Sequence, residues 1–220
     1  DFNLPTSNKI SLAFDRELPW WGLVATAEYA HVGVINAIRY EAINLGPGNG
    51  VLPDGRINYW GSTNRALWQR ADGASIGAGT PTGYTNNQRT GSNPAFSGSS
   101  TLLTNTSKGS ADFLTLSLAK QYSENWFGSA SVTFGRSTDV NPGTSSQAYT
   151  STPAFNPNDD VASRSNYDTE ARLLSALTWQ HRFFGDYVTS ISGVYNGYTG
   201  QPYSWTFNND ANGDGISGND

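Results

Sequence analysis

The sequence lacks cysteine and methionine and contains no long apolar run. Without cysteine, the chain excludes disulfides, thiolate metal sites and cysteine nucleophiles. Because residue 1 is not methionine, we interpret the chain as an internal fragment of a longer protein. No apolar run approaches the roughly 18 residues that a membrane-spanning helix needs. Any crossing of a membrane must therefore use strands.

Charge and hydrophobic residues are also sparse. The chain has 13 Lys and Arg against 18 Asp and Glu, a formal net charge of −5. No Lys/Arg cluster offers phosphate neutralisation, so we expect no nucleic-acid partner. Hydrophobic residues make up 36% and the mean hydropathy is −0.48, low for a packed soluble core, yet aromatics at 13% argue against disorder. A sheet with one apolar and one wet face accounts for both figures.

Apolar and polar residues alternate with a period of two in several segments, which predicts β-strands. The predicted strands lie near residues 9–17, 22–34, 111–121, 126–136, 168–181 and 187–198, and the predicted long loops are 35–110 and 137–167. Within the first loop, Asn36 to Leu45 and Gly55 to Gly61 also look strand-like, which predicts small hairpins there. Many of these strands run about 9 to 11 residues, the length that a tilted strand needs to cross the hydrocarbon core of a bilayer.

Charged residues in the middle of these strands fall on the polar face. Asp15, Glu28 and Arg172 all alternate with apolar neighbours in this way. A bilayer demands such a placement, because a charge that faces lipid at the midplane costs about 2 to 4 kcal/mol. We therefore assign the polar face to the lumen of a barrel and the apolar face to lipid.

Aromatic residues gather at the three short connections between the predicted strands. An amphipathic ring is stabilised at the headgroup level, so we interpret these residues as a membrane-interface belt. The sequence predicts an all-β, antiparallel up-and-down meander of about six strands, forming part of a transmembrane β-barrel wall, with its short turns toward the periplasm and long extracellular loops. The belt comprises Trp20, Trp21, Tyr122, Trp126, Phe127, Phe183, Phe184 and Tyr187.

A calcium-like motif begins at Asp210 near the end of the chain. Its sequence matches the start of a D-x-N-x-D-G calcium loop, in which alternate oxygens converge on one hard cation. In this interpretation Asp210, Asn212 and Asp214 supply side-chain oxygens to Ca²⁺, and Ile216 supplies a backbone carbonyl. The acid expected at the twelfth position falls at residue 221, and Asp220 lies one place early. The alternative is a polar turn, because tight turns select the same residues.

Other motifs give weaker indications of chemistry. Gly213-x-Gly215-x-x-Gly218 formally matches a dinucleotide fingerprint, but no strand-to-helix unit surrounds it. Gly73-Ala-Ser-Ile-Gly77 formally matches a nucleophile elbow, but a poor helix-forming segment follows it. His31 and His181 fall at predicted strand ends, where we expect rim residues, and Asp159-Asp160 is expected to keep its loop solvated. We therefore expect no catalytic residue and no enzyme activity.

Several short segments together resemble the carboxyl-terminal half of Oar-like TonB-dependent receptors, and the likeness extends from Ile10 to Asp220. The most specific segments are Gly200-Gln-Pro-Tyr-Ser-Trp205 and Asn209-Asp-Ala-Asn-Gly-Asp-Gly215. The others are Leu18-Pro-Trp-Trp-Gly22, Leu45-Gly-Pro47, Tyr59-Trp-Gly61, Leu114 to Tyr122, Trp126-Phe-Gly-Ser-Ala-Ser-Val132 and Gly193-Val-Tyr195.

The resemblance implies a large barrel in the outer membrane of Gram-negative bacteria, with an inserted plug domain. Such receptors import a ligand actively and are coupled through TonB to the inner-membrane proton gradient. The TonB box, the plug and the terminal aromatic strand are absent from this sequence, as expected for an internal fragment. The expected partners are outer-membrane lipid, an unidentified extracellular ligand and, through the missing plug region, the TonB complex. A different class remains open: a secreted calcium-dependent adhesive or carbohydrate-binding β-domain.

Overall fold

The computed structural model describes residues 2–43, 45, 48, 50–59, 101–143 and 152–220. Within these ranges the chain forms strands and loops but no helix, and therefore no helix that is long and apolar enough to cross a membrane. The strands are β1 (Thr6–Glu17), β2 (Leu23–Ala42), β3 (Thr101–Thr106), β4 (Ser110–Ser123), β5 (Trp126–Asp139), β6 (Ser163–Arg164), β7 (Ala171–Phe184) and β8 (Tyr187–Tyr198).

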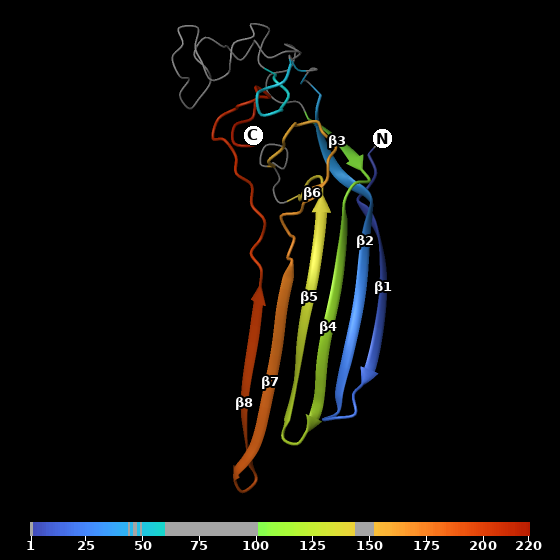
Figure 1. The fold of residues 1–220 in the computed structure, drawn as a ribbon, viewed down its shortest axis with the longest axis vertical. Coiled ribbons are helices and arrows are strands. Elements are labelled where there is room, and N and C mark those ends of the chain that lie inside the picture. Colours follow the sequence, from blue (N-terminus) through green and yellow to red (C-terminus); the bar gives the residue numbers. More distant parts are fainter. Residues whose placement is uncertain (1, 44, 46–47, 49, 60–100, 144–151) are drawn as a thin grey trace.

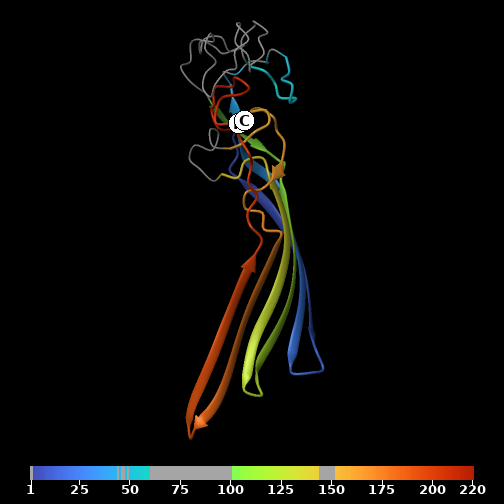
Figure 2. The ribbon, with the colours of Figure 1, turned by 60° about the vertical axis from the view of Figure 1, so that its left-hand side comes forward.

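All eight strands belong to one antiparallel sheet, which confirms the predicted all-β meander. Its main path runs β1-β2-β4-β5-β7-β8, while β3 pairs with β2 and β6 pairs with β5. The short turns lie at one end of the long strands, and the loops and both termini lie at the other (Figure 1). The sheet is twisted and open rather than closed into a barrel (Figure 2).

The three short turns contain residues with positive φ angles. Glu124 and Asn125 connect β4 to β5 with φ angles of 52° and 69°. Positive φ at both central positions is the conformation of a type I′ turn, whose twist matches that of the flanking strands. Trp21 and Gly22 have φ angles of 58° and 59° between β1 and β2, and Gly185 has 56° between β7 and β8. These turns join neighbouring strands directly and so produce an up-and-down order.

The predicted loop boundaries are wrong at two places. Strand β2 continues beyond residue 34 to Ala42, through part of the segment that the sequence predicted to be strand-like, and Ala37 to Ala42 pair with β3. The partner segment is distant in sequence, and local alternation does not reveal such a pairing. The segment 137–167 likewise contains the end of β5 and the two residues of β6.

Strand β7 begins at Ala171 and not at 168, because Asp168 serves the loop before it. The Asp168 side chain is buried and accepts hydrogen bonds from the Ser137 backbone N–H at 2.7 Å and from Arg164 Nε at 2.6 Å. These bonds hold the preceding loop against the end of β5. Asp168 therefore belongs to the loop before β7, which its side chain anchors.

Buried apolar residues are concentrated at the loop end of the molecule. Among the described residues, Leu52, Tyr59, Ala211 and Ile216 are buried there, whereas the only buried apolar residues in the strands are Ala30 and Ala42. Tyr59 is only 4% exposed, whereas Phe155 in the neighbouring loop is 60% exposed. The sheet itself therefore leaves its large apolar side chains uncovered.

Candidate functional site

The register of the sheet gathers apolar side chains on one face. Leu116 of β4 pairs with Ala27 of β2 and with Val132 of β5. The row continues to Phe14 in β1 and to Leu173 in β7. Because side chains two residues apart share a face, neighbouring rows are apolar as well. The face includes Ile10, Leu12, Phe14, Leu23, Ala25, Ala27, Tyr29, Leu114, Leu116, Leu118, Ala130, Val132, Phe134, Leu173, Leu177 and Ile191.

These apolar side chains are exposed. Leu12 is 75% exposed, Phe14 66%, Leu177 53% and Ile191 62%. The strands contact only their neighbours within the sheet, and no second layer packs on this face in the described part of the chain. A contiguous uncovered apolar surface of this kind marks a membrane or protein contact.

Charged residues bound the apolar face at the loop end. His31, Asp112 and Arg136 form one row across β2, β4 and β5. The Asp112 carboxylate accepts a hydrogen bond from the Tyr29 hydroxyl at 2.6 Å and lies 2.8 Å from His31 Nδ1. His31 thus lies in a charged row near the loop end of the apolar face.

Basic residues mark the other limit of the same face, at the turn end. Arg16 of β1 and Lys120 of β4 lie there, by the alternation of their strands. From Asp112 to Lys120 the strand rises about 27 Å. At the tilt of about 40° that barrel strands have, a strand of this length spans about 21 Å of the membrane normal, close to the ~25 Å apolar band of outer-membrane barrels.

Lys120 is buried beneath the aromatic cluster of the turn end. Its Nζ donates hydrogen bonds to the carbonyl oxygens of Ser123 at 2.9 Å and Trp126 at 3.2 Å. It also lies 4.3 Å from the centroid of the Trp126 ring, within the range of a cation–π contact. The ring of Trp21 meets Trp126 edge-on at 6.4 Å. Lys120 therefore ties the β4–β5 turn to the aromatic belt, a role that the sequence did not reveal.

A second group of rings extends the belt along β7. Trp179 pairs with Trp126 across β5 and β7 and stacks on His181 at 5.4 Å. Phe183 meets both of these rings edge-on. The other predicted belt residues also lie at the turn end and are exposed, namely Trp20, Trp21, Tyr122, Phe127, Phe184 and Tyr187.

The opposite face of the sheet carries polar side chains that pair across strands. The Thr115 and Thr133 hydroxyls lie 3.0 Å apart, and Arg172 Nε donates to Asn196 Oδ1 at 3.1 Å. Near the turn end of β1, the Thr26 hydroxyl donates to Asp15 Oδ1 at 2.5 Å. These pairs give the sheet one wet face and one apolar face.

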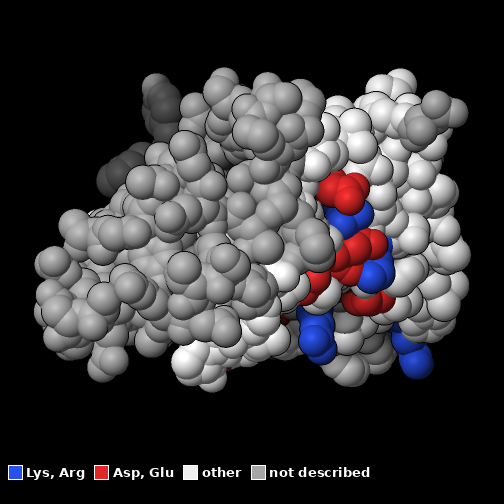
Figure 3. All heavy atoms as spheres, turned by 90° about the horizontal axis from the view of Figure 1, so that it is seen from above, with Lys and Arg blue, Asp and Glu red and all other residues white. Residues whose placement is uncertain are grey.

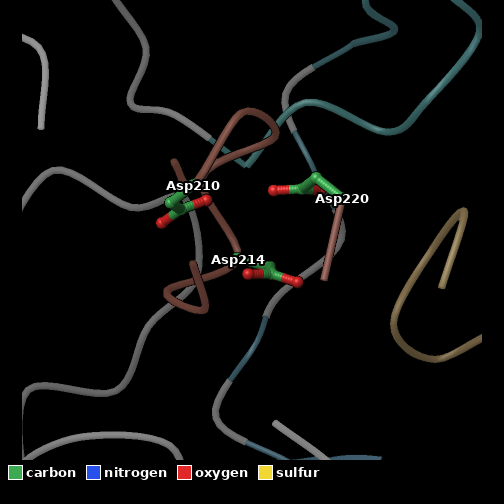
Figure 4. A group of neighbouring side chains, drawn as sticks. All are labelled: Asp210, Asp214 and Asp220. Atoms are coloured by element: carbon green, nitrogen blue, oxygen red, sulfur yellow. The ribbon is translucent and has the colours of Figure 1, made fainter. Parts of the chain in front are cut away.

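Three carboxylates meet in the loop that contains the calcium-like motif. One oxygen each from Asp210, Asp214 and Asp220 lies within 4.8 Å of the others. The three side chains surround one small space (Figure 4). Seen from the loop end, acidic and basic side chains lie side by side on the described surface (Figure 3). The fold thus brings Asp220 to the two predicted acids Asp210 and Asp214.

The other two residues of the motif, Asn212 and Ile216, form hydrogen bonds with Asp214 within the loop. Asn212 is fully buried, and its Oδ1 accepts the Asp214 backbone N–H at 2.8 Å. The Ile216 side chain is buried, and its backbone N–H donates to Asp214 Oδ1 at 2.7 Å. Gly218, with a φ angle of 86°, lies at the bend just before Asp220. This bend, and not the motif spacing, brings Asp220 into the group.

One arginine offsets part of this negative charge. Arg56 is buried, with its Nη2 2.7 Å from Asp54 Oδ2 and its Nη1 2.9 Å from Asp220 Oδ1. Its guanidinium also lies over the ring of Phe207 at 5.3 Å. Burial and the neighbouring Asp214 together raise the pKa of Asp220 to about 6 despite Arg56. At Asp220, burial and carboxylate repulsion therefore outweigh the attraction of Arg56.

The acidic loop also joins segments that are far apart in the sequence. The Tyr59 backbone N–H donates to the Asn212 carbonyl at 2.7 Å, and the Ala154 N–H donates to the Asn219 carbonyl at 3.0 Å. The Phe207 N–H donates to the Asp220 carbonyl at 2.8 Å. These hydrogen bonds connect the acidic loop to the neighbouring loops.

The weaker motifs gain no catalytic arrangement. The Gly213 to Gly218 segment forms bends and is not followed by a helix in the described chain. Asp160 accepts a hydrogen bond from the Thr106 hydroxyl at 2.7 Å and lies 3.6 Å from Lys108 Nζ, so it anchors its loop to β3. The Gly73 to Gly77 segment lies outside the described residues. Comparison of the chain with family models, curated proteins and solved structures gave no match.

Proposed function

We propose that the chain forms part of the barrel wall of a TonB-dependent outer-membrane receptor in a Gram-negative cell, for active uptake of an unidentified ligand. The observation that carries the membrane assignment is the uncovered apolar face of the sheet. It has the height of an outer-membrane band, with charges at both limits and aromatic rings at the turn end. A lipid bilayer satisfies each of these features.

A soluble adhesive or carbohydrate-binding domain would need to cover this apolar face. A soluble sandwich packs a second sheet against the first at about 10 Å. No such layer occurs among the described residues, and the outer strands β1 and β8 each have one unpaired edge. Unpaired edges of this length favour further strand pairing, which more wall strands on either side would supply.

The receptor assignment rests on the resemblance to Oar-like receptors. In this proposal the polar face of the sheet lines the conduit, and the long loops contribute to ligand capture on the outside of the cell. The turn end, with the aromatic belt, faces the periplasm. Contact with TonB is made through the plug region of the full-length receptor.

Spin labelling at two adjacent positions tests the membrane assignment. The chain has no cysteine, so single cysteines at Leu116 and Ser117 allow a nitroxide to be attached to either face of β4. In lipid vesicles, the label at Leu116 should be accessible to oxygen and protected from a water-soluble nickel chelate. The label at Ser117 should show the opposite. Equal accessibility at both positions would contradict a wall that separates lipid from water, and so would a monomeric protein that is soluble without detergent.

A separate experiment tests the coupling to TonB. The native protein is extracted from outer membranes in detergent and passed over immobilised TonB periplasmic domain. Retention that is strengthened by ligand-containing growth medium is expected for a receptor. If the spin labels report a membrane wall but TonB does not retain the protein, the barrel assignment stands and the receptor assignment is wrong.

A further inference from the structure

The acidic loop concentrates negative charge in a small, largely buried space. Asp210, Asp214 and Asp220 contribute three carboxylates, and the Arg56 Nη1 atom lies 2.9 Å from Asp220 Oδ1. Arg56 is shared with Asp54. The Asp220 side chain is completely buried, so water screens the repulsion at this carboxylate poorly. Such a group is stabilised when a small cation enters it.

An independent feature of Asn219 points to the same conclusion. Asn219 is only 2% exposed, and its Nδ2 donates to Asp214 Oδ2 at 2.9 Å. The amide therefore lies against the acidic group, yet its Oδ1 is buried and has no hydrogen-bond partner in the described part of the chain. Buried polar atoms are nearly always satisfied, and an amide oxygen is a ligand that hard cations accept.

We propose that Asp210, Asp214, Asp220 and Asn219 bind one divalent cation of the size of calcium. Calcium takes six to eight oxygen ligands in flexible geometry, which suits carboxylates and an amide from a bent loop. Magnesium requires stricter octahedral geometry and retains its waters, so it fits this set less well. Asp220 replaces the acid that the motif spacing placed at position 221.

The cation would fix the loop end of the molecule. The loop bonds through its backbone to Tyr59, Ala154 and Phe207, so one ion would hold together segments from three parts of the chain. Extracellular calcium modules bind with dissociation constants of about 0.1 to 1 mM. This property does not depend on whether the sheet belongs to a TonB-dependent receptor.

Terbium luminescence tests the site on the native protein in detergent micelles after treatment with a chelator. Tyr59 is buried against the loop and can sensitise bound Tb³⁺ on excitation near 280 nm. Calcium should displace Tb³⁺ with a half-effect at about 0.1 to 1 mM, and magnesium should require at least tenfold more. The double variant Asp214→Asn/Asp220→Asn should lose the signal, while Asp186→Asn in the β7–β8 turn should keep it. Unchanged Tb³⁺ or Ca²⁺ binding in the double variant would overturn the proposal.

Asn219 provides a test that survives misfolding of the double variant. Asn219→Asp adds a fourth carboxylate beside Asp214, so calcium affinity should rise several-fold and the calcium-induced shift in Tm should increase. Asn219→Leu should reduce affinity at least fivefold. A purely structural asparagine would give loss of stability in both variants and no gain in calcium affinity. Equal affinity in Asn219→Asp and the unsubstituted protein would contradict the proposed ligand set.

Discussion

Leu116 lies in the middle of the apolar face. If this face meets lipid as proposed, Leu116→Arg should strongly destabilise the protein in a bilayer. The residue is equally distant in sequence from Asp112 and Lys120, which mark the two limits of the face. It pairs with Ala27 and Val132, which offer no counter-charge. An arginine that faces lipid at the midplane costs about 2 to 4 kcal/mol. The folding equilibrium should therefore shift by about 30- to 900-fold.

Two matched variants separate this effect from a general intolerance of arginine. Ser117→Arg places the same side chain on the polar face, beside Thr26 and Ser131, and should change the free energy of unfolding by about 0.5 kcal/mol or less. Ser110→Arg lies on the apolar side of β4 but beyond the row of Asp112, and should cost about 0 to 1 kcal/mol.

Reversible denaturant unfolding in phospholipid vesicles, followed by tryptophan fluorescence, measures all three variants. The expected order of destabilisation is Leu116→Arg far above Ser110→Arg and Ser117→Arg. An equal cost at Leu116 and Ser117 would refute the reasoning, because it would mean that the two faces of β4 meet the same environment. A Leu116→Arg protein as stable as the unsubstituted protein would refute it as well.

Three further predictions concern packing and pH. Gly128→Ala should lower the free energy of unfolding in vesicles by about 1 to 3 kcal/mol, because the new Cβ would lie 2.5 Å from the Ala176 carbonyl oxygen. As a control, Gly193→Ala should be tolerated, because its Cβ would meet nothing within 4 Å. Equal costs for the two variants would contradict this. Lys120→Ala should lower the free energy of unfolding by about 1.5 to 3 kcal/mol, because the hydrogen bonds of Lys120 to the Ser123 and Trp126 carbonyls are lost. A change of about 0.5 kcal/mol or less would show that the turn does not depend on Lys120. With a chelator present, the free energy of unfolding should fall as pH rises from about 4 to about 6. The pKa of Asp220 is about 6 in the folded protein and close to the ordinary aspartate value of 3.8 in the unfolded chain. The folded protein therefore retains this proton to a higher pH, and the stability it provides is lost as the carboxyl ionises. The change should reach about 3 kcal/mol and be absent in Asp220→Asn; an equal slope in both proteins would contradict it.

Much of the sheet could be predicted from the sequence because its strands are amphipathic. Most of the main strands alternate apolar and polar residues, and β8 does so less cleanly. Each short turn carries residues that accept a positive φ angle, such as Asn125 and Gly185. Local pattern was insufficient for β3 and β6. Strand β3 pairs with the last six residues of β2, which are far away in sequence, and β6 is only two residues long. Neither has an alternating pattern strong enough to be recognised alone.

The candidate metal site also combines residues that the sequence predicted with residues that only the folded chain brings together. Asp210 and Asp214 were predictable, because the motif spacing places alternate oxygens in one tight loop. Asn212 and Ile216 belong to the same motif and form hydrogen bonds with Asp214 that stabilise the loop. Asn219 lies outside the motif positions, so the motif did not indicate it as a ligand. Burial of Asn219 depends on the neighbouring loops, which only the folded chain brings together.

The sequence alone determined that this protein is an antiparallel sheet with one apolar and one polar face, because a strand's side chains alternate with a period of two whatever their surroundings. The tertiary structure decided that no layer covers the apolar face in the described residues, and that its limits are set by His31, Asp112 and Arg136 at one end and by Arg16 and Lys120 at the other. It also brought Asp220 and Arg56 together. Such contacts depend on strand register and loop packing between distant segments, and local composition does not encode them.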